Sequence, residues 1–186
     1  MMPALGTAEL TVQERGILAT SASAAYPDCF SRVDRLLVGT FQQPALTPRT
    51  RTYYSRGQAY TMEWRDYGQP LPAWFDPLMQ GFVDLLTLPP NWDSYGAGAI
   101  DPRIVQEAMD LINGLLGPTT PAPRAVPLSS SGIQLEWRRQ GVELEIVFDP
   151  GEQPFFYYRN RVSGDESEHV LPENSALLRS IIGNLA

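Results

Sequence analysis

The sequence contains no lysine, because all 14 of its basic side chains are arginines, and it has a single histidine, His169, and a single cysteine, Cys29. Lysine-dependent catalysis through a Schiff base or a P-loop is therefore excluded. Metal cages built from several histidines or cysteines are excluded as well. A lone cysteine cannot form an internal disulfide, which is typical of a protein in a reducing cytoplasm. The residues left for chemistry are carboxylates, hydroxyls and arginines.

The chain also lacks long apolar runs and a net positive charge. No stretch approaches the roughly 18 apolar residues of a membrane-spanning helix, and the N-terminus shows no secretory pattern, so we expect a cytoplasmic protein without membrane contact. The net charge of −7 disfavours non-specific binding to nucleic acid, since a polyanion repels an acidic protein. A length of 186 residues suits one domain, or one domain with an extension.

We expect residues 1–75 to form an N-terminal extension that consists of a helix and a hairpin. Asp28 is a suitable cap for a helix over residues 28–41, whose apolar positions follow helical spacing. Tyr, Thr and Trp residues on both sides of a turn near residues 55–57 predict a hairpin over residues 52–65. A weaker helical pattern covers residues 9–19, and residues 42–52 are typical of a loop.

Residues 76–186 are expected to form an α+β core. Asp76 and Pro77 predict the start of a helix that ends before Pro89, and Asp101 and Pro102 predict the start of a second helix, which ends near residue 116. Strict alternation of apolar and polar residues predicts strands over 133–137 and 142–148, followed by a strand over 155–161 and a closing helix over 175–185. The extended connector 119–127 and the loop 163–174 join these elements. The predicted fold is an antiparallel sheet of about three to five strands with helices packed mainly on one face.

Two motifs of this core resemble a widespread family of small bacterial proteins without an established activity. The first is residues 88–97 (LPPNWDSYGA), and the second is residues 132–137 (GIQLEW), followed after a turn by residues 142–146 (VELEI). The likeness covers about residues 85–150, and what it implies is the α+β fold. Members often carry a histidine directly after the second motif, where this chain has Arg138, so no role of that histidine carries over.

The loop over residues 91–98 is the first candidate site. Asn and Asp side chains accept backbone hydrogen bonds in turns, and Gly96 and Gly98 permit positive φ angles. Trp92, Asp93 and Tyr95 would then form a binding loop in which aromatic surface lies beside a carboxylate. The alternative is a compact loop whose Trp92 fills the seam between sheet and helices.

The second candidate is the predicted hairpin, where arginines alternate with aromatic residues over residues 49–67. Arg51, Tyr53, Tyr54 and Arg56 have the composition of a single-stranded nucleic-acid surface, and Tyr, Trp and Arg are also enriched at protein interfaces. The alternative is an edge hairpin whose arginines prevent aggregation.

The third candidate is a carboxylate cluster of Glu136, Glu143 and Glu145, to which Asp93 could be added. Such a cluster could bind a divalent metal in a hydrolase. The alternative is a sheet surface on which nearby arginines neutralise the glutamates. His169 is expected in a surface loop, because the sequence shows no nucleophile elbow and no cysteine-protease signature.

The sparse catalytic inventory favours a non-catalytic protein-interaction subunit or regulator of the bacterial cytoplasm, with no cofactor, no metal and no catalytic residue. Its predicted contact residues are Arg51, Tyr53, Tyr54, Arg56, Trp92, Asp93 and Tyr95. The alternatives are a metal-dependent hydrolase that uses the glutamate cluster and a single-stranded nucleic-acid-binding protein, which the net charge disfavours.

Overall fold

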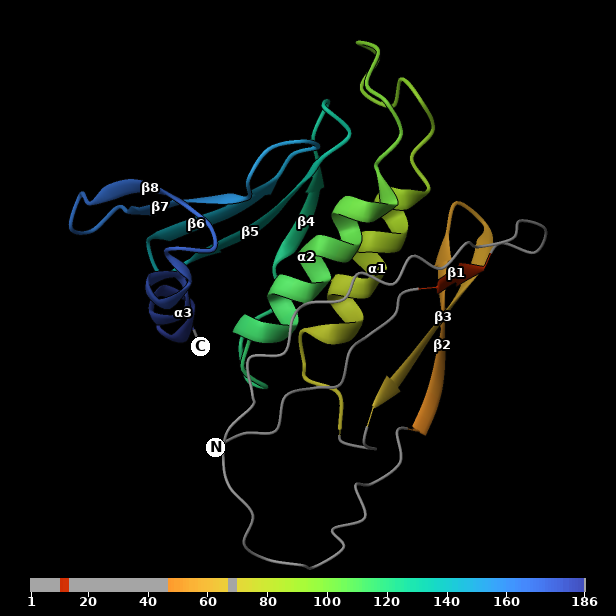
Figure 1. Cartoon of the computed structure of the whole chain (residues 1–186), viewed down its shortest axis with the longest axis horizontal. Coiled ribbons are helices and arrows are strands. Elements are labelled where there is room, and N and C mark those ends of the chain that lie inside the picture. The colour runs from red at the N-terminus through yellow and green to blue at the C-terminus, as the bar shows by residue number, and fades with distance from the viewer. Residues whose placement is uncertain (1–10, 14–46, 67–69, 186) are drawn as a thin grey trace, which may run out of the picture.

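The computed structural model describes residues 11–13, 47–66 and 70–185. Within these ranges the chain forms three helices and two antiparallel sheets (Figure 1). The α+β fold and the antiparallel sheet that the sequence predicts are therefore confirmed. None of the described helices is both long and apolar enough to cross a membrane.

The larger sheet is a meander in which each strand pairs with the next strand of the chain. Its five strands are β4 Arg124–Pro127, β5 Ile133–Arg139, β6 Val142–Phe148, β7 Phe155–Asn160 and β8 Glu166–Val170. The alternating pattern over β5 and β6 is confirmed, since Leu135, Leu144 and Ile146 are fully buried. The predictions of a connector over residues 119–127 and of a loop over residues 163–174 were wrong in part. Each of these ranges contains an edge strand of this sheet. Edge strands are often short and polar, which conceals them in a sequence.

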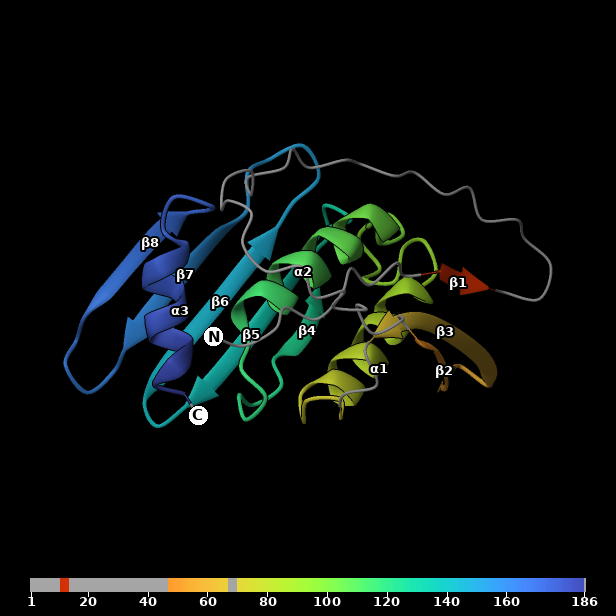
Figure 2. The same cartoon turned by 60° about the horizontal axis from the view of Figure 1, so that its bottom comes forward.

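The helices are α1 Phe75–Leu86, α2 Pro102–Leu115 and α3 Ser175–Gly183. Figure 2 shows α2 and α3 on one face of the larger sheet, while α1 lies beside β4, between that sheet and the hairpin. The arrangement of helices on one face is therefore as predicted. The opposite face of the sheet carries the polar residues of the alternating strands, as an antiparallel sheet with one solvated face allows.

The two predicted helix starts had different outcomes. Asp101 caps α2 as expected, because its Oδ1 accepts a hydrogen bond from the Arg103 backbone nitrogen at 2.9 Å. The prediction that Asp76 caps α1 is wrong, since the cap position is Trp74 and Asp76 lies inside the first turn. Trp74 is fully buried and donates from Nε1 to the Gly117 oxygen at 3.1 Å, so the helix begins two residues earlier than predicted, next to an anchored side chain.

The smaller sheet contains β1 Thr11–Gln13, β2 Thr47–Ser55 and β3 Gln58–Asp66 in the order β1-β3-β2. The predicted hairpin is confirmed, and its turn residues Arg56 and Gly57 have φ angles of 50° and 78°, as a two-residue turn of type I′ requires. The loop predicted over 42–52 is wrong from Thr47 onward, where β2 begins. The prediction of a weak helix over residues 9–19 is wrong at residues 11–13, which form β1. The helix predicted over residues 28–41 lies outside the described residues.

The hairpin packs on α1 and shares the hydrophobic core of the rest of the chain. Tyr53, Tyr60 and Met62 point toward the helix and are buried together with Phe82 and Val83 of α1. The described part of the N-terminal extension therefore contributes to the common core.

Candidate functional site

The loop between α1 and α2 projects beyond the ends of both helices, and it contains the first of the two family-like motifs (Figure 1). Two side chains hold its backbone in place. Asp93 Oδ1 accepts hydrogen bonds from the backbone nitrogens of Tyr95 at 2.8 Å and Ala97 at 3.1 Å. Asn91 Oδ1 accepts from the Gly96 nitrogen at 2.7 Å, and the Asn91 nitrogen donates to the Ala97 oxygen at 2.7 Å. The loop is therefore closed on itself by its own polar side chains.

Three residues of this loop have left-handed backbone conformations. The φ angles are 61° at Asn91, 66° at Ser94 and 94° at Gly96. Asn tolerates this region better than most residues, but Ser does not favour it, so the local hydrogen bonds must compensate for the strain. The hydrogen bonds that the Tyr95 and Ala97 amides donate to Asp93 favour its ionised carboxylate. They therefore lower the pKa of Asp93.

The loop is also fixed against the turn between β4 and β5. The Asp101 nitrogen donates to the Ser131 oxygen at 3.0 Å. At Gly98, a Cβ atom would lie against Ser131 Oγ, far inside van der Waals contact, so a larger residue would require the Ser131 hydroxyl to move. The neighbouring Gly132 has no room for a Cβ either, because the Phe148 oxygen occupies that place.

The three predicted contact residues of the loop have different roles. Tyr95 is 93% exposed, which makes it the most exposed large hydrophobic side chain among the described residues. Asp93 is used internally, as a hydrogen-bond acceptor. Trp92 is partly buried, and its Nε1 is a buried donor without a partner among the described residues. Of these three side chains, Tyr95 is therefore the one that is largely exposed.

The four predicted contact residues of the hairpin divide in a similar way. Arg51 Nη1 lies 2.9 Å from Asp76 Oδ2, and the Tyr53 hydroxyl donates to Asp76 Oδ1 at 3.0 Å. Burial, and secondly the bond to Asp76, raise the pKa of Tyr53, which is only 6% exposed. Tyr54 points to the opposite face of β2 and is 70% exposed, and Arg56 is exposed in the turn.

The hairpin and the loop are joined at the end of α1. Ser55 Oγ lies 2.9 Å from Thr87 Oγ1, and Thr87 directly precedes the loop. Gln80 Nε2 of α1 donates to the Tyr54 oxygen at 2.9 Å. The two groups of predicted contact residues thus belong to one packed unit, although they lie on separate elements.

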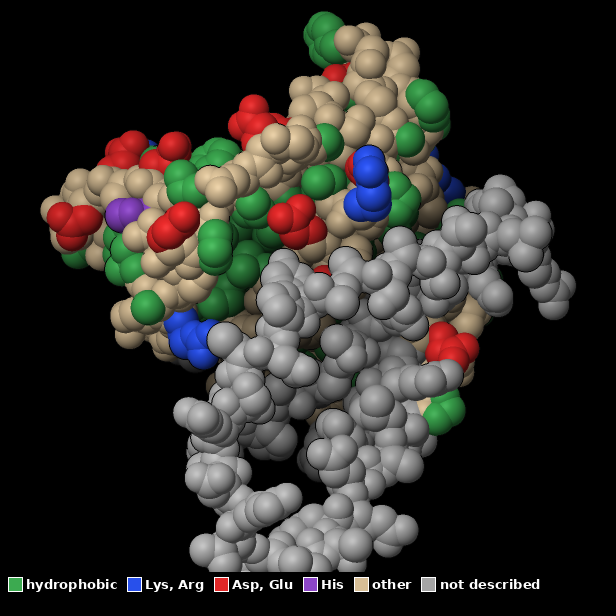
Figure 3. Space-filling view, viewed as in Figure 1, with side chains coloured by type: hydrophobic (Ala, Val, Ile, Leu, Met, Phe, Trp, Pro, Cys, Tyr) green, Lys and Arg blue, Asp and Glu red, His purple; other side chains and the backbone are tan. Residues whose placement is uncertain are grey.

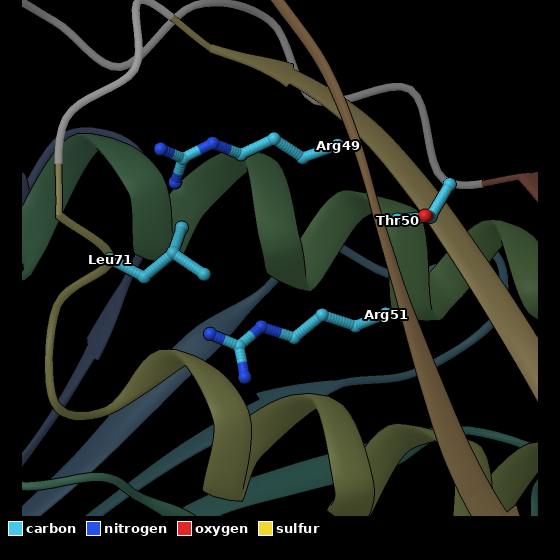
Figure 4. A pocket seen from close by; sticks show the side chains of 4 residues that line it. All are labelled: Arg49, Thr50, Arg51 and Leu71. Atoms are coloured by element: carbon cyan, nitrogen blue, oxygen red, sulfur yellow. The ribbon is translucent and has the colours of Figure 1, made fainter.

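The sequence reasoning missed a hollow beside β2. Among the described residues it is lined by Arg49, Thr50, Arg51 and Leu71, and its volume is about 410 Å³. Figure 4 shows the side chains of Arg49 and Arg51 extending in the same direction, one on each side of Leu71 in this view. No signal for it was present in the sequence, because Arg49 and Arg51 fall in the range predicted as a loop, and residues two apart share a face only on a strand.

The glutamate cluster lies on the face of the larger sheet that carries no described helix. Glu136 and Glu145 are direct cross-strand partners, and Arg138 Nη2 lies 3.6 Å from the first and 3.5 Å from the second. Glu143 forms ion pairs with Arg161 and Arg159, and the Arg161 guanidinium holds the pKa of Glu143 below its ordinary value. Arginines therefore neutralise these carboxylates, and the described residues include no group of three or more potential ligands placed to hold a metal ion.

The prediction that His169 lies in a surface loop is wrong, because the residue lies on β8. It is partly buried, and its ring lies 5.1 Å from the ring of Phe156. On the face shown in Figure 3, charged side chains of both signs are scattered over the described surface, and no continuous basic stripe is visible.

Comparisons with known protein families, with curated proteins and with solved structures found no match to this chain. The resemblance to the bacterial family therefore stays a prediction, and the function must be argued from the geometry.

Proposed function

We propose that this protein is a non-catalytic interaction subunit or regulator of the bacterial cytoplasm, and that the loop over residues 88–98 contacts its protein partner through Tyr95. One observation carries the proposal: a side chain that is 93% exposed stands on a loop whose backbone is fixed by Asp93 and Asn91. Tyrosine is among the residues that contribute most to binding at protein interfaces.

The fixed loop supports this function for an energetic reason. Binding costs free energy whenever a mobile loop must be ordered, and a loop that is already ordered avoids this cost. Strained backbone conformations such as those of Asn91 and Ser94 persist only where the surroundings enforce them, and they are frequent at functional sites.

The two alternative functions have less support. A metal-dependent hydrolase needs carboxylates that are available to a cation, whereas Glu136, Glu143 and Glu145 are each paired with arginines. A single-stranded nucleic-acid surface needs stacking aromatics beside basic residues, whereas Tyr53 is buried and its neighbour Arg51 is paired with Asp76.

The test is co-purification of a tagged protein from its native cells, with mass spectrometry of what elutes with it. The wild-type chain should retain a protein partner in stoichiometric amount, and Tyr95→Ala should lose it while keeping its thermal stability. Tyr54→Ala is the matched control, because Tyr54 is a second highly exposed tyrosine on a different element. Retention of the partner by Tyr95→Ala would refute the role of the loop.

A further inference from the structure

The segment that carries Tyr95 is almost free of charge. In residues 85–100 the only charged residue is Asp93. The turn between β4 and β5, which is hydrogen-bonded to the end of this segment, lies in a second stretch, residues 125–135, that contains no charged residue. In Figure 3 the projecting loop at the top of the molecule is almost entirely green and tan. This tip therefore differs from the rest of the described surface, where ion pairs between arginines and carboxylates recur.

The one carboxylate of the segment is engaged within the loop. Asp93 Oδ1 accepts the backbone amides of Tyr95 and Ala97, and the side chain is partly buried. Tyr95, two residues further along, is 93% exposed. The most exposed large side chain that the segment presents is therefore an uncharged ring with a single hydroxyl group.

Tyr95 has the shape of an isolated knob. Its neighbours in the sequence, Ser94 and Gly96, are small and exposed, so they leave the sides of the ring accessible. A flat partner surface would cover only one side of such a ring, whereas a concave site buries most of the group that enters it. The shape of the loop therefore favours a pocket on the partner over a flat surface.

The same loop offers further apolar surface without charge. Pro89, Pro90 and Ala99 are exposed. Removal of apolar surface from water is favourable whatever the charge of the partner, and proline and alanine lose no side-chain rotamer freedom when they are covered. A partner that receives Tyr95 can therefore gain additional apolar contact from the loop.

We infer that Tyr95 inserts into an uncharged, apolar pocket of the partner protein, in which a polar group forms a hydrogen bond with the phenolic hydroxyl. The inference rests on the proposed function and adds to it the chemistry of the partner's site. Burial of the ring supplies most of the affinity of this contact, and the hydroxyl bond supplies a smaller share. The net charge of −7 acts on the approach of the partner from a distance, whereas the contact itself does not depend on charge.

A nucleic acid does not fit this loop. Binding to phosphates requires basic side chains, and the sequence contains none between Arg65 and Arg103. Stacking of successive bases requires several exposed aromatic faces, whereas Trp92, the other aromatic residue of the loop, is partly buried. The lack of basic groups in the loop also disfavours an acidic peptide as the group that meets Tyr95.

The test immobilises the protein that co-purifies with the wild-type chain and titrates it with intact variants on a biosensor. Tyr95→Ala should weaken binding by about thirtyfold or more, because a whole ring leaves the pocket. Tyr95→Phe should weaken it by only about three- to tenfold, the share of one neutral hydrogen bond. Tyr95→Glu should bind no better than Tyr95→Ala, since an unpaired charge cannot enter an apolar pocket. Tyr54→Glu makes the same change at a second exposed tyrosine and should stay within about twofold of the wild type.

Ionic strength gives an independent measurement on the same biosensor. Raising NaCl from about 50 mM to about 1 M should change the affinity of the wild type by less than about threefold, whereas a contact made of ion pairs should weaken by about tenfold or more. The larger salt effect, or tighter binding of Tyr95→Glu than of Tyr95→Ala, would overturn the uncharged pocket but leave Tyr95 as a contact residue. Wild-type affinity of Tyr95→Ala, or no co-purifying protein at all, would instead refute the proposed function, so the two failures are distinguishable.

Discussion

The Tyr53 hydroxyl donates a hydrogen bond to Asp76 Oδ1 at 3.0 Å, and this bond connects the inner face of the β2–β3 hairpin to the first turn of α1. Arg51 occupies the other oxygen of the same carboxylate at 2.9 Å. One carboxylate therefore anchors two residues of β2. This anchor holds the hairpin against α1 and thereby fixes which face of β2 packs on the helix.

Removal of the Tyr53 hydroxyl should destabilise the fold. We expect Tyr53→Phe to lower the free energy of unfolding by about 1 kcal/mol, since the hydrogen bond is lost while the ring stays buried. The loss should be smaller in an Asp76→Ala background, because the acceptor is already absent, so a double-mutant cycle should give a coupling energy of about 0.5 kcal/mol or more. Urea unfolding measures all four proteins. Tyr54→Phe is the control and should change stability by less than about 0.5 kcal/mol.

Alkaline pH should also loosen this anchor. Burial and the bond to Asp76 raise the pKa of Tyr53 above its ordinary value of 10.0, so the folded protein holds this proton more tightly than the unfolded chain does. The resulting stability is fully present below pH 10 and is lost as the pH rises toward the raised pKa.

Thermal unfolding between pH 9 and pH 11.5 measures this loss. The melting temperature of the wild type should fall more steeply above about pH 10 than that of Tyr53→Phe, which has no hydroxyl to ionise. Tyr157, whose pKa is raised by its hydrogen bond to Glu166, contributes to the same fall, so the variant should reduce the slope without abolishing it. Identical slopes for the two proteins would contradict the assignment.

Gly132 should tolerate no side chain. A Cβ at this position would overlap the Phe148 backbone oxygen, and the backbone of β6 cannot move aside without breaking its pairing with β5. We expect Gly132→Ala to destabilise the protein by about 3 kcal/mol or more. Gly114→Ala is the control, because a Cβ at Gly114 in α2 would meet nothing within 4 Å and alanine favours a helix. Chemical denaturation should therefore move the two midpoints in opposite directions.

Asp93→Ala should free the loop that presents Tyr95. The variant removes the acceptor of the Tyr95 and Ala97 amides, so hydrogen exchange at these two amides should accelerate, while exchange at Leu135 in the core stays slow.

Low pH should have the same effect on the wild type. The pKa of Asp93 is lowered by these bonds, and the contribution of its carboxylate is present above the ordinary pKa and lost as the pH falls through the lowered one. Unchanged exchange in the variant would show that other contacts hold the loop.

Much of the fold could be predicted from local sequence patterns. These patterns suffice where the residues of one helix or strand determine its structure by themselves. The alternation in β5 and β6 and the Asp-Pro start of α2 are examples, because each is encoded within a few neighbouring residues. Strands β4 and β8 could not be predicted in this way. β4 has four residues with a proline at its end, and β8 (ESEHV) has little apolar alternation. Pairing with an adjacent strand defines both, and pairing is a tertiary property.

The candidate site was predictable to a similar extent. The turn chemistry of Asn91 and Asp93 indicated a closed loop, but only the structure separates Asp93, which holds the backbone, from Tyr95, which is exposed. In the hairpin, period two places Tyr53 and Tyr54 on opposite faces, yet the sequence does not indicate which face α1 covers. Once that face is known, Arg49 joins Arg51 beside the edge of β2.

The central claim is that Tyr95 contacts a protein partner, and site-specific photocrosslinking in native cells tests it most directly. Benzoylphenylalanine in place of Tyr95 should give one discrete adduct with a second protein on irradiation. The same probe in place of Leu177, which is exposed on α3, should not give this adduct. No adduct from position 95, or the same adduct from both positions, would contradict the account.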